Sequence, residues 1–180
     1  MNQFSKVTRR IAIVLGLVAA SSGAWAQSSA TNTANATATV VRPITVSSST
    51  DLAFGNVVPS GSIGTLTVAA SATPAPVAAG GVTQPGTQAG TITAAVFDVA
   101  GEGSLTYSIT LPGAAATING PSAATMTVDT FTSSIASGTL SGSLGSAGTQ
   151  SFYVGGKLHV GINQTAGNYT GTFSVTVAYN

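Results

Sequence analysis

Short segments of alternating apolar and polar residues make up most of the chain after residue 27. These segments are rich in Val, Ile, Thr, Phe and Tyr, and Gly or Pro separates them at short intervals. This pattern is typical of short strands joined by turns, and no helical periodicity is present. The sequence therefore predicts an all-β fold of about eight strands, most simply a β-sandwich.

The expected strands differ in how clearly they alternate. The clearest is 169–179, where Phe173, Val175, Val177 and Tyr179 share one face. Gly155 and Gly156 predict a bulge or tight bend inside 152–160. The Ala-, Pro- and Gly-rich segment 71–89 is interpreted as a long loop. The remaining expected strands are 43–46, 63–69, 90–99, 105–111, 125–131 and 135–144.

The first 26 residues have the layout of a secretory signal peptide. Three basic residues among the first ten precede an apolar run at 11–20, and Ala24 and Ala26 occupy the −3 and −1 positions of a cleavage site. The apolar run is shorter than the roughly 20 residues that cross a bilayer. We therefore expect export through the inner membrane to the periplasm and the cell surface, with no membrane insertion of the mature chain.

Removal of the signal peptide changes the charge. Arg42 and Lys157 are then the only basic residues besides His159, against four carboxylates, so the formal charge is −2. Such a chain offers no basic patch for nucleic acid, and its low charge favours association. The chain has no cysteine, which excludes disulfides and thiol catalysis.

The residues that could carry chemistry are few. The single histidine, His159, shares a strand face with Lys157 and has no nucleophile with it in a recognisable motif. Asp98 and Glu102 could approach a cation from the end of a strand, but calcium requires six to eight oxygen ligands. We therefore expect no enzyme activity, no metal and no cofactor.

Residues 27–41 precede the expected single domain, 42–180, and have a different pattern. By composition they resemble a flexible linker, yet Thr33 to Val40 alternates strictly. Pro43 then interrupts the alternation, because proline lacks the N–H that a strand ladder uses. The apolar face of this N-terminal extension consists of Ala34, Ala36, Ala38 and Val40.

Five segments distributed over the chain resemble an exported bacterial family catalogued as domain of unknown function 4402. They are 51–55 (Asp-Leu-Ala-Phe-Gly), 97–101 (Phe-Asp-Val-Ala-Gly), 107–112 (Tyr-Ser-Ile-Thr-Leu-Pro), 152–156 (Phe-Tyr-Val-Gly-Gly) and 167–173 (Gly-Asn-Tyr-Thr-Gly-Thr-Phe). The C-terminal strand, with Tyr179 in the penultimate position and Gly167 fourteenth from the end, resembles chaperone–usher pilins.

The pilin resemblance implies an immunoglobulin-like sandwich that lacks its last strand. A periplasmic chaperone first fills the exposed groove, and the extension of another copy replaces it with the help of an outer-membrane usher. The resulting head-to-tail filament, a pilus or fimbria, would support adhesion or biofilm formation. Carried onto this chain, the donor strand is Ala34, Ala36, Ala38 and Val40; Gly167, Phe173, Val175, Val177 and Tyr179 line the acceptor groove; and Asn180 contacts the chaperone.

The small size of the donor side chains leaves an alternative open. Three alanines and one valine would contribute only about 4–5 kcal/mol, and the opposite register buries the hydroxyls of Thr37 and Thr39. The alternative is a secreted or surface-attached matrix- or carbohydrate-binding module that is complete in one chain. Sugar-binding faces often present aromatic side chains, and the mature chain has no Trp.

Overall fold

The computed structural model describes residues 29–180; the predicted signal peptide lies outside this range. The chain separates into two units, which divide after Ala38. The described part of the first unit, residues 29–38, is exposed and contains no strand. The second unit, Thr39–Asn180, contains every described strand.

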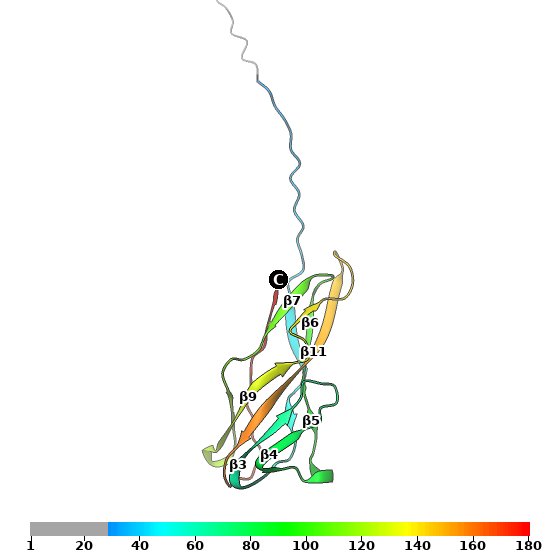
Figure 1. Cartoon of the computed structure of the whole chain (residues 1–180). Helices are drawn as coiled ribbons and strands as arrows, with labels where there is room; N and C mark the ends of the chain where they lie inside the picture. Colours follow the sequence, from blue (N-terminus) through cyan, green and yellow to red (C-terminus); the bar gives the residue numbers. More distant parts are fainter. Residues whose placement is uncertain (1–28) are drawn as a thin grey trace, which may run out of the picture. The chain divides into compact units, whose positions relative to one another are not determined.

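The described residues form twelve strands and two short 3-10 turns, which confirms the all-β prediction (Figure 1). In chain order these are β1 (Thr45–Thr50), β2 (Ala53–Phe54), β3 (Val58–Val68), β4 (Val77–Thr83), η1 (Gly86–Gln88), β5 (Ile92–Thr93), β6 (Ala95–Glu102), β7 (Thr106–Thr110), β8 (Ala116–Asn119), η2 (Pro121–Ala123), β9 (Thr125–Ser133), β10 (Ser137–Thr139), β11 (Ala147–Val160) and β12 (Thr176–Tyr179).

The long strand β11 organises the larger sheet, whose order is β1-β6-β11-β3-β4. The first half of β11 pairs with β6, and its second half pairs with β3 on one edge and with β9 on the other. β8 extends the sheet beyond β9. The register against β9 shifts between Gly155 and Lys157, which confirms the predicted irregularity. A Cβ atom at Gly155 would lie 2.2 Å from the carbonyl oxygen of Val68, so only glycine allows β3 to approach this closely.

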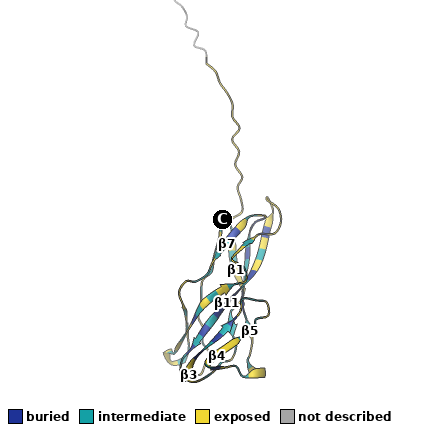
Figure 2. Ribbon diagram, viewed as in Figure 1, coloured by how far each residue is buried: buried dark blue, intermediate teal, exposed yellow. Residues whose placement is uncertain are grey.

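The second layer is the three-stranded sheet β10-β7-β12. It covers the half of the larger sheet formed by β6 and the start of β11. Tyr107 from β7, Val99 from β6 and Phe152 from β11 are fully buried between the two layers. Figure 2 shows how buried positions alternate with exposed ones along the strands, as strands with one face on a core require. The two layers form a β-sandwich, as predicted.

A second core cluster lies on the other half of the larger sheet, toward the end where β3 and β4 lie in Figure 1. Its buried members are Leu66, Val82, Val128, Leu158 and Val160. The three-stranded sheet does not contribute to this cluster. Residues of the β1–β3 connection, including Leu52, Phe54 and Val57, pack against it instead. The second layer is therefore thin over this half of the domain.

Three sequence predictions about strands were wrong in part. Of the expected strand 135–144, only β10 (Ser137–Thr139) forms. The expected loop 71–89 contains β4, whose Gly81 packs so tightly on β3 that a Cβ atom there would lie 2.0 Å from the carbonyl oxygen of Ser62. Here glycine permits a close approach between strands and does not mark a loop. The expected strand 169–179 forms only from Thr176 onward, because 171–175 has no strand to pair with among the described residues.

Candidate functional site

An open apolar groove of about 1070 Å³ lies where the second layer of the sandwich is thin. One wall is the segment 51–57, which includes β2, and the other wall is the segment 164–173, which precedes β12. The floor is the inner face of the larger sheet and includes Ala95, Phe97, Val128, Leu158 and Val160. We call this hollow the open groove. We call the place between the two walls, where the three-stranded sheet does not cover the larger sheet, the gap.

Aromatic contacts fix one side of the open groove. The ring of Phe173 stacks on Phe131 with centroids 4.8 Å apart and meets Phe97 edge-on at 6.0 Å. Phe97 also stacks on Phe152 at 5.6 Å. Phe173 thereby links the C-terminal segment to β6 and β9 of the larger sheet. The main chain of residues 171–175 is held in place by this side chain although it is not part of a strand.

The wall at 164–173 is positioned further by Gly167 and Tyr169. Gly167 has φ of +146°, and a Cβ atom there would lie 2.6 Å from the ring of Pro121. The hydroxyl of Tyr169 donates to the carbonyl oxygen of Thr165 at 2.7 Å and accepts a hydrogen bond from Gln164. Thr170 forms an isolated bridge with Asn119 of β8. The wall is thus anchored at its start, while 171–175 forms no main-chain hydrogen bond to the described chain.

Two strand edges of the domain are unpaired as well. β12 pairs with β7 through one edge only, and the N–H of Asn180 donates to Thr106 at 3.2 Å. Because hydrogen-bonding direction alternates along an antiparallel strand, the main-chain groups of Val177 and Tyr179 then point to the outer edge of β12. β1 likewise pairs only with β6 and lies beside β12. Within the described domain, β1 and β12 therefore each have one edge without a partner strand.

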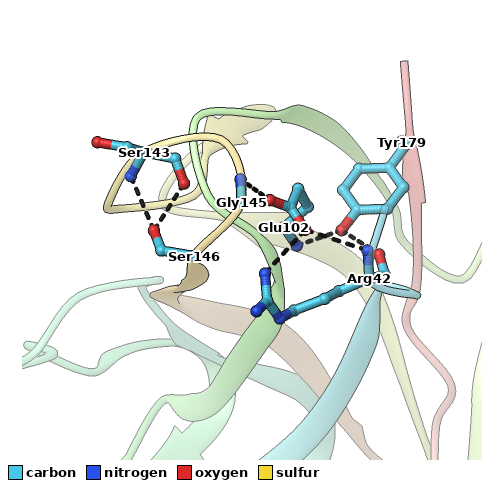
Figure 3. A network of polar contacts seen from close by, with 6 residues as sticks. All are labelled: Arg42, Glu102, Ser143, Gly145, Ser146 and Tyr179. Carbon is cyan, nitrogen blue, oxygen red and sulfur yellow. Dashed lines mark hydrogen bonds and ion pairs between the residues drawn. The ribbon is translucent and has the colours of Figure 1, made fainter. Parts of the chain in front are cut away.

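A polar cluster lies at the end of the domain where β12 finishes (Figure 3). The N–H of Arg42 and its guanidinium both bind Oε2 of Glu102, at 3.2 and 3.0 Å. The Tyr179 hydroxyl accepts a hydrogen bond from the Glu102 N–H at 2.6 Å and donates to the carbonyl oxygen of Arg42 at 3.0 Å. We call these three residues, together with Gly145, the clasp. It joins the base of the extension to β6 and β12.

The carboxylate of Glu102 is the centre of the clasp and is 2% exposed. Its other oxygen accepts a hydrogen bond from the N–H of Gly145, which a Ser143–Ser146 turn holds in place at φ of +90°. The N–H groups of Arg42 and Gly145 lower the pKa of Glu102 below its usual value. A buried carboxylate with this many donors is a satisfied structural ion, and Asp98 and Glu102 both lie within β6.

The residues predicted for the site fall into three groups. Gly167 and Phe173 line the open groove. Val175, Val177 and Tyr179 pack against the first core cluster instead and do not line the open groove. The extension residues are exposed, with Val40 at 94%. The sequence analysis missed the wall at 51–57 and the clasp; the clasp links residues 60 positions apart, and no local pattern indicates it.

The outer face of the larger sheet carries the remaining titratable cluster. Nε2 of His159 lies 2.9 Å from Oδ1 of Asp129, and the hydrogen bond from His159 lowers the pKa of Asp129. A shallower hollow of about 470 Å³ beside His159 has no aromatic residue in its lining. Among residues 29–180 there is no group of three or more His, Cys, Asp or Glu side chains that could hold a metal ion. The described part of the chain also has no helix long and apolar enough to cross a membrane.

The structure thus defines the domain as a β-sandwich with an open groove over one half of its larger sheet. Residues 44–179 match the profile of the family described as Domain of unknown function (DUF4402). The match covers most of the chain, so the protein belongs to this family, as the sequence motifs predict. No significant match was found to a curated protein or to a solved structure.

Proposed function

We propose that the protein is a structural subunit of a bacterial surface filament, in which the extension of one copy fills the open groove of the next. The observation that carries this proposal is the presence of both halves of such a contact in one chain. The domain has an apolar groove, and its strands β1 and β12 each have one edge without a partner strand. The extension is an exposed, alternating segment with no partner strand among the described residues.

The dimensions of the two halves support the proposal. On β11 the floor of the open groove includes Leu158 and Val160, which are roughly 7 Å apart at 3.3 Å per residue. The alternating stretch from Thr33 to Val40 would span about 26 Å as a strand. One face of the extension is therefore long enough to cover the floor.

The chemistry of the groove supports a strand as its occupant. The main-chain groups along the outer edge of β12 and in 171–175 have no partner in the described chain. Strand addition supplies main-chain hydrogen bonds for affinity, and alternating side chains fix the register. Those hydrogen bonds add to the modest 4–5 kcal/mol from the side chains of the extension.

The position of the clasp supports a head-to-tail arrangement. The clasp holds the start of the domain beside β6 and β12, and no clasp residue lines the open groove. Each copy then presents its extension at one end and receives one at the other. A contact of this kind does not close on itself and builds a filament.

The proposal includes the partners that a free edge requires. An unpaired edge above an apolar groove is an aggregation hazard in a free subunit. We therefore propose that a periplasmic chaperone covers the groove and contacts the C-terminal Asn180. An outer-membrane usher then replaces the chaperone with the extension of the next copy. In this account the protein is exported and serves adhesion or biofilm formation without enzyme activity.

The experiment compares the purified mature protein with a variant that lacks residues 27–40, by size-exclusion chromatography and electron microscopy. We expect fibres or a ladder of oligomers from the mature protein, and folded monomers from the variant. If both are stable monomers with the same melting temperature, the extension is only a tail. The domain would then be a self-complete surface module, and the filament proposal would be wrong.

A further inference from the structure

The extension is covalently attached beside a gap that it could fill in its own molecule. β1 begins only three residues after Arg42, and its free edge leads to the open groove. A reversal of the chain before β1 would lay the extension along this edge. Attachment through a short flexible segment gives an effective concentration on the order of millimolar, which would favour self-insertion over assembly. This inference rests on the proposed function, in which the extension must enter the groove of another copy and not its own.

The tightest reversal would place the wrong face of the extension inward. A two-residue loop at Arg42 and Pro43 would pair Thr39 with Val46. Directly opposed residues of an antiparallel pair point to the same face, and Val46 packs against the core. Thr37 and Thr39 would then face the core, and their hydroxyls would need partners there.

A reversal with the apolar face inward requires a loop with an odd number of residues. A three-residue loop at 41–43 would pair Ala38 with Val46 and turn the apolar face of the extension toward the core. Three-residue hairpin loops need a left-handed conformation at their last position, which here is Pro43. The proline ring fixes φ near −65° and excludes that conformation. A five-residue loop at 39–43 would remove Val40, the largest apolar side chain, from the paired segment.

The clasp adds a second restraint at the same point. Its hydrogen bonds engage both main-chain polar groups of Arg42: the N–H binds Glu102, and the carbonyl oxygen accepts from Tyr179. A residue that precedes proline is also restricted to extended conformations. Any turn through Arg42 would break these hydrogen bonds and leave the carboxylate of Glu102, which is 2% exposed, without two of its donors.

We propose that Arg42 and Pro43, held by the clasp, prevent the extension from entering the groove of its own chain and so reserve it for a second copy. The test replaces the restraint with a loop that permits reversal. The double substitution Arg42→Asn with Pro43→Gly supplies a residue that adopts the left-handed conformation readily at the last loop position. The full mature chain is used, and Arg42→Asn alone is the matched control because it keeps Pro43.

Two measurements report the result. Sedimentation over a concentration series gives the association constant, and hydrogen exchange on the monomer gives the protection of amides 34–40. We expect the double variant to associate at least tenfold more weakly than the unmodified chain, with at least tenfold greater protection of those amides in the monomer. The Arg42→Asn control loses the guanidinium contact to Glu102 but keeps Pro43, so it should change much less than the double variant in both measurements. Circular dichroism of each variant shows whether it is folded. The single variant Pro43→Gly, which keeps the clasp intact, then separates self-insertion from loss of folding.

The outcomes distinguish this inference from the proposed function. The inference would be overturned if the double variant and the unmodified chain had the same association constant and the same low protection of amides 34–40. The filament proposal would then still stand. Protected amides in the unmodified monomer would also overturn the inference, because self-insertion would then occur despite the proline. An unmodified chain that never associates would overturn the proposed function. Protection in the double variant alone would still support the restraint.

Discussion

A charge on the inward face of the extension should abolish assembly, whereas the same charge on the outward face should not. The informative substitutions are Ala36→Asp and Thr37→Asp, which are adjacent in sequence and on opposite faces of the alternating segment. Both add one carboxylate to the same exposed stretch. Their difference therefore measures the direction of the side chain in the assembled state.

The expected magnitude follows from the lining of the open groove. The apolar face of the extension contributes about 4–5 kcal/mol through one valine and three alanines. No basic residue lines the groove, and its one charged residue is Asp51, which would repel a second carboxylate. Burial of an unpaired carboxylate costs several kcal/mol. This cost offsets most of the free energy that the side chains of the extension contribute to association. A loss of about 3 kcal/mol or more weakens association more than a hundredfold.

The assay is sedimentation velocity over a concentration series, which measures the association constant of each variant. We expect Ala36→Asp to remain monomeric where the unmodified chain assembles, and Thr37→Asp to stay within a few-fold of it. Association that is reduced equally by both substitutions would mean that the extension acts only through its charge. Loss of association in Thr37→Asp alone would mean that the register is the opposite one.

Three further predictions concern the domain itself. Phe173→Ala should lower the free energy of unfolding by about 3 kcal/mol in urea denaturation, because it removes two aromatic contacts from a partly buried site. Gly155→Ala should destabilise by about 1–3 kcal/mol, because the new Cβ atom would lie 2.2 Å from the carbonyl oxygen of Val68. Hydrogen bonds lower the pKa of Glu102 from its usual value of 4.5, and the largest contribution comes from the N–H of Arg42. The stabilisation from Glu102 should therefore be present above pH 4.5 and disappear as the pH falls through the folded-state pKa, and Glu102→Gln should remove this part of the acid dependence in thermal melts.

The alternation of apolar residues predicted the fold class well because a strand with one buried face needs that pattern whatever its neighbours are. It predicted which face of 173–179 is apolar, and those side chains do pack against the core. It could not predict that 171–175 would lack strand structure, because strand formation depends on a partner and the described chain supplies none there. The pattern describes the side chains, while the missing ladder reflects the gap in the second layer.

The parts of the candidate site that the sequence did not predict depend on contacts between distant residues. The wall at 51–57 contains only the two-residue strand β2, so no alternation could indicate it. Glu102 is bound by Arg42 from 60 residues away, and its second oxygen by Gly145 from the turn before β11. The mature chain has two basic and four acidic residues, so an ion pair was to be expected. The sequence could not show which basic residue pairs with which acidic one.

The central claim, that the extension of one copy lies in the groove of another, can be tested by disulfide trapping, because the chain has no cysteine of its own. The double variant Ala36→Cys with Ala53→Cys places one thiol on the apolar face of the extension and one on the groove wall. After oxidation, non-reducing electrophoresis should show a ladder of covalent oligomers. The control, Ala36→Cys with Thr149→Cys on an exposed part of β11 outside the groove, should show none. Equal ladders from both variants, or only monomers from the first, would contradict the account.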